Sequence, residues 1–137
     1  MTLFIASDHA GFELKQKLKT SFDLEDLGPD SDESVDYPDY AKALCEKVLA
    51  TNSKGILLCG SGIGMSITAN RFQGIRAALV NSEELAALSR QHNDANVLIL
   101  AARFIYEDQA QKIVNTWLNT DFEGGRHQRR VEKIEKC

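Results

Sequence analysis

Short apolar runs recur along the chain without the polar alternation of a half-exposed strand. They lie at 3–6 (LFIA), 55–59 (GILLC), 75–80 (IRAALV) and 97–101 (VLILA). Uninterrupted runs of this length are typical of parallel strands that helices cover on both faces. A weaker candidate lies at 23–27 (DLEDL). The pattern therefore predicts five strands.

The segments between these runs carry apolar residues at helical spacing. Apolar side chains recur every four positions within 14–22 and again within 40–49. A further helix is predicted at 82–91, where a Ser precedes two Glu residues as at a helix start, and another around 113–118. Strands that alternate with helices predict a Rossmann-like, three-layer α/β/α sandwich around a five-stranded parallel sheet.

The chain shows no linker, repeat or low-complexity tract, so we expect one domain over 1–137. The longest irregular polar stretch, 26–38, is expected to be a surface loop with a function. The glycines at 124–125 break the chain before a basic final segment, 124–137.

Composition narrows the function classes. The net charge of −4 gives no reason to expect a nucleic-acid partner or an anionic membrane surface. The N-terminal apolar run is too short for a signal peptide or a membrane span. Cys45, Cys59 and Cys137 are odd in number and contain no CxxC pair, which argues against disulfides or a zinc site. We therefore expect a cytoplasmic protein.

Side chains capable of chemistry follow the predicted strands, and the carboxyl ends of parallel strands meet at one edge of a sheet. They are Asp8 and His9 after the first strand, Asp36 and Tyr37 after the weak second, Cys59 after the third and Arg103 after the fifth. Each has an alternative structural role: Asp8 would cap a helix, and Cys59 would be a buried thiol. Their convergence favours a catalytic site.

Residues 60–64 (GSGIG) follow Cys59 directly. They resemble the start of a dinucleotide-binding fingerprint, but Met65 stands where its last glycine or alanine belongs, and the loop follows the wrong strand. Backbone amides in such a loop stabilise negative charge and would favour the thiolate of Cys59. The loop therefore fits a transient oxyanion better than a cofactor phosphate.

The basic segment places Arg126 and Arg130 four residues apart, on one face if the segment is helical. A solvated helix face is the alternative. Together with Arg103 and His9, these cations would suit a phosphate dianion.

Five stretches together resemble one family, in its order: SDHAGFELK, DYPDYA, CGSGIGMSITANRFQGIRAA, LSRQHNDANVL and GGRHQRRVEKI. The family is the type B ribose-5-phosphate isomerases, which also includes galactose-6-phosphate isomerase subunits. The resemblance implies an aldose–ketose isomerase without metal or cofactor, acting on a small sugar phosphate. It also implies a dimer or a dimer of dimers.

The resemblance implies a role for each matching residue. It makes Cys59 the proton-transfer base, with Ser61 and the amides of Gly60, Gly62 and Gly64 holding the enediolate. His92 would open the sugar ring with help from Asp8. His9, Arg103, Arg126 and Arg130 would bind phosphate, and Asp36, Tyr37 and Asn93 would meet hydroxyls. One branch of the family uses a Glu base where this chain has Met65, so the chain resembles the Cys-base branch.

His92 and Asn93 precede the fifth strand, at the edge opposite Cys59. A five-residue strand separates them by roughly 15 Å, which no side chain spans. Either His92 is a helix-end residue without a role, or the active site is shared between two chains; the resemblance favours the second.

Two alternative functions remain: an isomerase for a six-carbon sugar phosphate such as allose or galactose 6-phosphate, and a nucleotide-binding or redox-sensing module.

Overall fold

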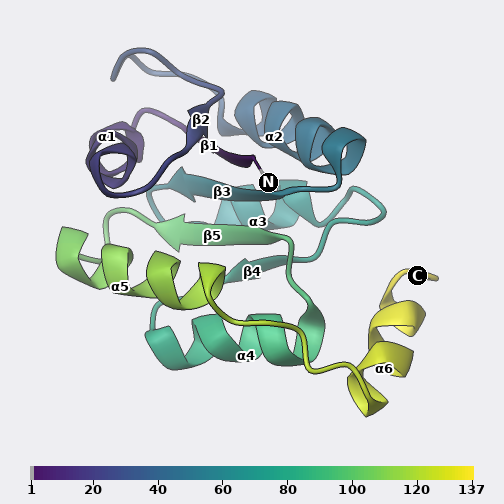
Figure 1. The fold of residues 1–137 in the computed structure, drawn as a ribbon. Coiled ribbons are helices and arrows are strands. Elements are labelled where there is room, and N and C mark those ends of the chain that lie inside the picture. The colour runs from purple at the N-terminus through teal and green to yellow at the C-terminus, as the bar shows by residue number, and fades with distance from the viewer. Residues whose placement is uncertain (1) are drawn as a thin grey trace.

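The computed structural model describes residues 2–137 and contains one parallel sheet with helices on both faces (Figure 1). The strands are β1 (Leu3–Ser7), β2 (Glu25–Asp26), β3 (Lys54–Cys59), β4 (Ala77–Leu79) and β5 (Val97–Ala101), in the order β2-β1-β3-β5-β4. The helices are α1 (Phe12–Ser21), α2 (Tyr37–Thr51), α3 (Ile63–Ala69), α4 (Glu83–Asn93), α5 (Glu107–Leu118) and α6 (Arg126–Ile134). The predicted fold class is confirmed.

The central strands are buried on both faces, as their unbroken apolar runs predict. Alternate residues of β3 enter two different cores: Ile56 and Leu58 face the core under α1, α4 and α5, whereas Leu57 and Cys59 face the core under α2 and α3. Figure 1 shows these two helical layers on either side of the sheet. Since both faces need apolar side chains, alternation with polar residues would disrupt one core.

The ends of the helices follow local sequence signals. Ser82 begins α4, and its side chain accepts a hydrogen bond from the amide of Leu85 at 3.1 Å, as expected of a capping serine. Asp36 precedes α2, and Pro38 lies in the first turn of that helix, where a missing N–H costs least. The basic segment is helical, as α6. Among the helices of residues 2–137, none is long and apolar enough to cross a membrane.

The prediction of a loop at 26–38 is correct for the middle of this segment and wrong at both ends. Asp26 ends β2, and Tyr37 and Pro38 already belong to α2. The beginning of the loop is also anchored in the interior. The fully buried ammonium group of Lys15 donates to Asp26 at 2.8 Å and to the carbonyl of Pro29 at 2.5 Å. A buried charge needs such partners, so the loop has a fixed origin.

Candidate active site

Cys59 is the last residue of β3 and is 5% exposed. Its Sγ accepts a hydrogen bond from the amide of Gly62 at 3.2 Å. Gly62 has φ 75°, a left-handed conformation that favours glycine, and this turns its N–H back toward the sulfur. The Ser61 hydroxyl accepts from the amide of Ile63 at 3.2 Å and is exposed. The loop thus directs a backbone donor at the thiol of Cys59.

Two glycines of the same loop allow side chains from elsewhere to approach its backbone. A Cβ at Gly60 would lie 3.1 Å from Nη1 of Arg103, and a Cβ at Gly64 would lie 2.5 Å from the Tyr37 ring. The amide of Arg103 also donates to the carbonyl of Gly60 at 3.0 Å. The predicted gathering of Arg103 and Tyr37 beside the glycine loop is therefore confirmed.

Asp8 and His9 lie at the end of the neighbouring strand. The amide of Asp8 donates to the carbonyl of Leu58 at 3.1 Å, and its carboxylate accepts from the amide of Gly11 at 3.0 Å. The carboxylate thus closes the turn before α1, whose N-cap is Gly11 with no side-chain cap hydrogen bond, so the alternative role of Asp8 as the cap of that helix is wrong; its second carboxylate oxygen is left for another partner. His9 Nδ1 accepts from the amide of Val35 at 3.2 Å. This bond places the imidazole proton on Nε2 and ties the loop that carries Asp36 to β1.

We call these residues the carboxyl-edge cluster. Its members are Asp8, His9, Asp36, Tyr37, Cys59, Gly60, Ser61, Gly62, Gly64 and Arg103.

His92 and Asn93 end α4 at the opposite edge of the sheet, as predicted. The amide of Gly55, near the start of β3, donates to the carbonyl of Asn96, just before β5, at 3.0 Å. His92 therefore lies beside the amino ends of the strands, whereas Cys59 lies at a carboxyl end. Figure 1 shows α6 on the same side as the end of α4, away from the tips of the strand arrows.

His92 packs against α6. Its ring stacks on that of His127 with centroids 4.2 Å apart and planes 14° apart. Both Nε2 atoms face one carboxylate oxygen of Glu123, at 3.8 Å from His92 and 3.7 Å from His127. Burial, together with the nearby His92 and the cations Arg126 and Arg130, lowers the pKa of His127. The stacked pair is therefore biased toward a neutral His127.

We call this second group the amino-edge cluster. Its members are His92, Asn93, Glu123, Arg126, His127 and Arg130. The four residues predicted to bind phosphate thus do not meet within one chain, because His9 and Arg103 belong to the carboxyl-edge cluster. Arg126 and Arg130 are exposed on α6 at the other edge.

His92, Glu123 and His127 are the group within residues 2–137 whose types and spacing could hold a metal ion. Their ligand atoms lie within 4.8 Å of one another. Arg126 and Arg130 on the same helix oppose a further positive charge there. A metal-free reaction stays a prediction.

The other two cysteines differ from Cys59. Cys45 is fully buried, and burial, with a smaller effect of Glu46, raises its pKa to about 12. Cys137 is exposed at the end of the chain. Of the three, Cys59 accepts from a backbone amide and precedes the glycine that Arg103 approaches.

Sequence reasoning gave no role to His127, Glu123 or Arg76. His127 stands within the basic segment, but nothing local indicates its stacking on His92. Arg76 interrupts the apolar run 75–80, and a charge inside a predicted strand was the available signal. Its side chain donates to Asn93, Asp94 and Glu135.

Comparison with known proteins gives consistent matches. The family described as Ribose/Galactose Isomerase matches residues 3–134. The chain is 50% identical to the probable ribose-5-phosphate isomerase B of Mycoplasma genitalium, over 96% of this chain and 92% of that protein. It is 44% identical to the ribose-5-phosphate isomerase B of Escherichia coli, over 93% and 89% respectively.

Solved structures agree with these matches. A ribose 5-phosphate isomerase of Thermotoga maritima superposes with a TM-score of 0.95 at 51% identity, covering 99% of this chain and 98% of that one. The ribose-5-phosphate isomerase B of Mycoplasma genitalium, solved with bound ribulose-5-phosphate, gives a TM-score of 0.91 at 48% identity, with 98% and 94% covered.

Proposed function

The chain belongs to the ribose/galactose isomerase family, and on that premise we propose that it interconverts ribose 5-phosphate and ribulose 5-phosphate, with Cys59 as the proton-transfer base. Membership of an isomerase family also decides against the nucleotide-binding and redox-sensing alternatives. The resemblance seen in the sequence is confirmed at the level of the family.

The observation that carries the proposal is the hydrogen bond from the amide of Gly62 to Cys59 Sγ, at the mouth of the glycine loop. Aldose–ketose isomerisation needs one base to take the proton from C2 and return it to C1, while a hydroxyl proton moves from O2 to O1. It also needs donors for the enediolate oxygens. Cys59 supplies the base, which the amide of Gly62 already holds, and Ser61 with the amides of Gly60 and Gly64 supplies the donors.

The remaining residues bind and open the sugar. In this proposal His92 opens the ring with Asp8. Phosphate is held by His9, Arg103, Arg126 and Arg130, and hydroxyls by Asp36, Tyr37 and Asn93. A neutral His9 that donates through Nε2 suits a phosphate oxygen, because its Nδ1 already accepts from Val35.

These roles require two chains, since the two clusters lie at opposite edges of one sheet. We propose a two-fold symmetric homodimer, alone or as half of a dimer of dimers, in which the amino-edge cluster of one subunit completes the carboxyl-edge cluster of its partner. Exposed apolar side chains adjoin the glycine loop and support this: Ile63 and Ile67 on α3 are each 56% exposed, and Leu79 on the edge strand β4 is 40% exposed. A second copy of the chain would cover them.

The test is an assay of purified protein with ribose 5-phosphate, and with allose 6-phosphate and galactose 6-phosphate alongside. We expect ribulose 5-phosphate as the product and much weaker turnover of the six-carbon substrates. Preferred turnover of a six-carbon sugar phosphate would replace the proposed substrate, and inactivity on all three would contradict the isomerase assignment.

The same assay tests the absence of a metal. Exhaustive chelation should leave the rate unchanged, because backbone amides and Ser61 already provide donors for the enediolate. A loss of activity that added divalent metal restores would show that a metal takes part.

A further inference from the structure

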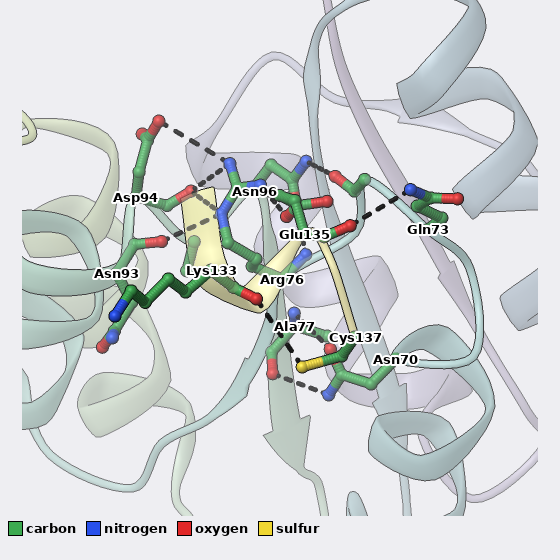
Figure 2. A network of polar contacts seen from close by, with 12 residues as sticks. Asn70, Gln73, Arg76, Ala77, Asn93, Asp94, Asn96, Lys133, Glu135 and Cys137 are labelled. Carbon is green, nitrogen blue, oxygen red and sulfur yellow. Dashed lines mark hydrogen bonds and ion pairs between the residues drawn. The ribbon is translucent and has the colours of Figure 1, made fainter. Parts of the chain in front are cut away.

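Arg76 joins the two helices that carry the amino-edge cluster (Figure 2). It lies directly before β4, and its side chain is 16% exposed. On one side, Nε donates to the carbonyl oxygens of Asn93 at 2.9 Å and Asp94 at 3.2 Å, and Nη2 donates to Asp94 at 3.0 Å. On the other side, Nη1 donates to Glu135 Oε1 at 2.5 Å. One planar guanidinium thus makes both attachments.

The first attachment fixes the end of α4. The last carbonyls of a helix have no partner within it, and they carry the negative end of its dipole. Asp94, with φ 47°, turns the chain out of α4 and leaves these carbonyls facing Arg76. The contact lies one and two residues beyond His92. Together with the hydrogen bonds from Arg90 to Asp94 at 2.8 Å and to the carbonyl of Ala95 at 2.7 Å, it sets where the proposed ring-opening imidazole lies.

The second attachment fixes the end of α6. Glu135 caps that helix, and its carboxylate would be unfavourable beside the negative end of the helix dipole without a cation. Gln73 adds a hydrogen bond to the carbonyl of Glu135 at 3.1 Å. At the other end of α6, His127 stacks on His92. The helix that presents Arg126 and Arg130 is thus held at both ends.

A cavity of about 450 Å³ lies between the C-terminal end of α6 and the segment before β4, and its lining includes Asn70, Arg76, Ile134 and Glu135. At this end of α6 the polar contacts of Arg76 and Gln73 therefore bridge the space, whereas the buried His127 and Val131 pack the rest of the helix against the molecule.

We propose that Arg76 is a positioning residue for the half of the active site that one subunit contributes to the other. It holds α4 and α6 in one spacing, so that His92 and the two α6 arginines reach the same sugar phosphate. The inference rests on the proposed function. A ring-opening group and a phosphate site must match the length of one substrate, and small misplacements of such groups are costly.

Three variants test the two attachments. Glu135→Gln removes only the charge that holds α6, so KM for ribose 5-phosphate should rise about 10-fold, the usual effect of losing a charged hydrogen bond, with kcat almost unchanged. Arg76→Met removes both attachments, so KM should rise and kcat should also fall. Arg76→Lys can keep one attachment, and its KM and kcat should lie between those of the wild type and Arg76→Met.

Arg129→Met is the matched control, because it removes a positive charge from an exposed position of the same helix. It should leave KM and kcat close to wild type. The inference is wrong if Glu135→Gln and Arg76→Met retain wild-type KM, or if Arg129→Met raises KM as much as they do. Should Arg76→Met not fold, Glu135→Gln alone decides.

Subunit mixing distinguishes positioning from a general loss of stability. Arg76→Met chains should regain activity when refolded with Cys59→Ala chains, because the hybrid has one site with an intact half from each subunit. They should regain none with His92→Ala chains, because both defects affect the amino-edge cluster. Recovery with both partners, or with neither while hybrids form, overturns the inference.

If the active site is not shared between subunits, the mixing experiments give a different set of results. In that case Cys59→Ala and His92→Ala chains would not restore each other either, whereas the KM effect of Glu135→Gln would remain.

Discussion

The two edges of the sheet present their functional residues by different means. At the carboxyl edge, the backbone positions the functional groups. A left-handed Gly62 turns its amide toward Cys59, and Gly60 and Gly64 let Arg103 and Tyr37 approach the loop. At the amino edge, side chains hold the helices, through the His92–His127 stack and through the contacts of Arg76 with Glu135 and with the carbonyls that end α4. The carboxyl edge is therefore preformed for chemistry, and the amino edge depends on charges that hold its helices.

The largest expected effect is on proton transfer at the carboxyl edge. Cys59→Ala should lower kcat by about 10²–10⁴-fold with a modest change in KM, because it removes the positioned base. Iodoacetamide should inactivate the wild type, and substrate should protect it.

Cys137→Ala is the control for this experiment, since Cys137 is exposed and Cys45 is buried with a pKa raised to about 12. It should retain full activity and full sensitivity to iodoacetamide. A Cys59→Ala enzyme with near-normal kcat would show that the base is another group.

The next effect concerns the buried contacts of Lys15 that anchor the 26–38 loop. Lys15→Met leaves Asp26 and the carbonyl of Pro29 without their buried cation, so the free energy of unfolding should fall by about 3–5 kcal/mol. Lys19→Met is the matched control: Lys19 also binds Asp26, at 2.8 Å, but is one-third exposed and should cost at most about 1 kcal/mol. Urea unfolding measures both, and equal losses would contradict the role of burial.

A smaller effect tests whether both edges bind one phosphate. Arg103→Ala at one edge, and Arg126→Ala or Arg130→Ala at the other, should each raise KM about 10-fold and change kcat less, because phosphate binding is largely uniform along the reaction. Steady-state kinetics with ribose 5-phosphate measures this, and unphosphorylated ribose should be a very poor substrate. If only one edge affects KM, the phosphate is bound by that edge alone.

The smallest effect is a dependence on pH. Burial, His92 and the α6 arginines lower the pKa of His127 in the folded chain, so the unfolded chain binds its proton more readily. The contribution of the stack to stability is therefore present above the ordinary pKa of histidine, about 6.5, and is lost as pH falls through the lowered value. KM should rise as the pH is lowered below that value.

His127→Gln is the control, because the substrate phosphate also titrates near pH 6. The variant should show only the part of the KM rise that comes from the substrate. Identical dependence of KM on pH in wild type and variant would show that His127 does not cause the rise.

The sequence predicted the carboxyl edge better than the amino edge for a physical reason. Apolar runs show where the strands end. Asp8 and Cys59 stand at or directly after such ends, so their place at the carboxyl edge follows from the local sequence. The stack of His92 on His127 and the contact of Arg76 with Glu135 join residues 35 and 59 positions apart, and no periodicity indicates such pairs. The contacts of buried Lys15 with the start of the 26–38 loop were also not predicted, since a lysine in an amphipathic helix is expected at the surface.

In the proposed dimer, each active site combines the carboxyl-edge cluster of one chain with the amino-edge cluster of the other. Cys59→Ala and His92→Ala proteins should each be nearly inactive alone. After co-refolding at equal amounts, random pairing gives hybrids with one site free of both defects, and activity should recover toward about a quarter of wild type. Hybrids that form, yet remain as inactive as the parents, would contradict the shared site.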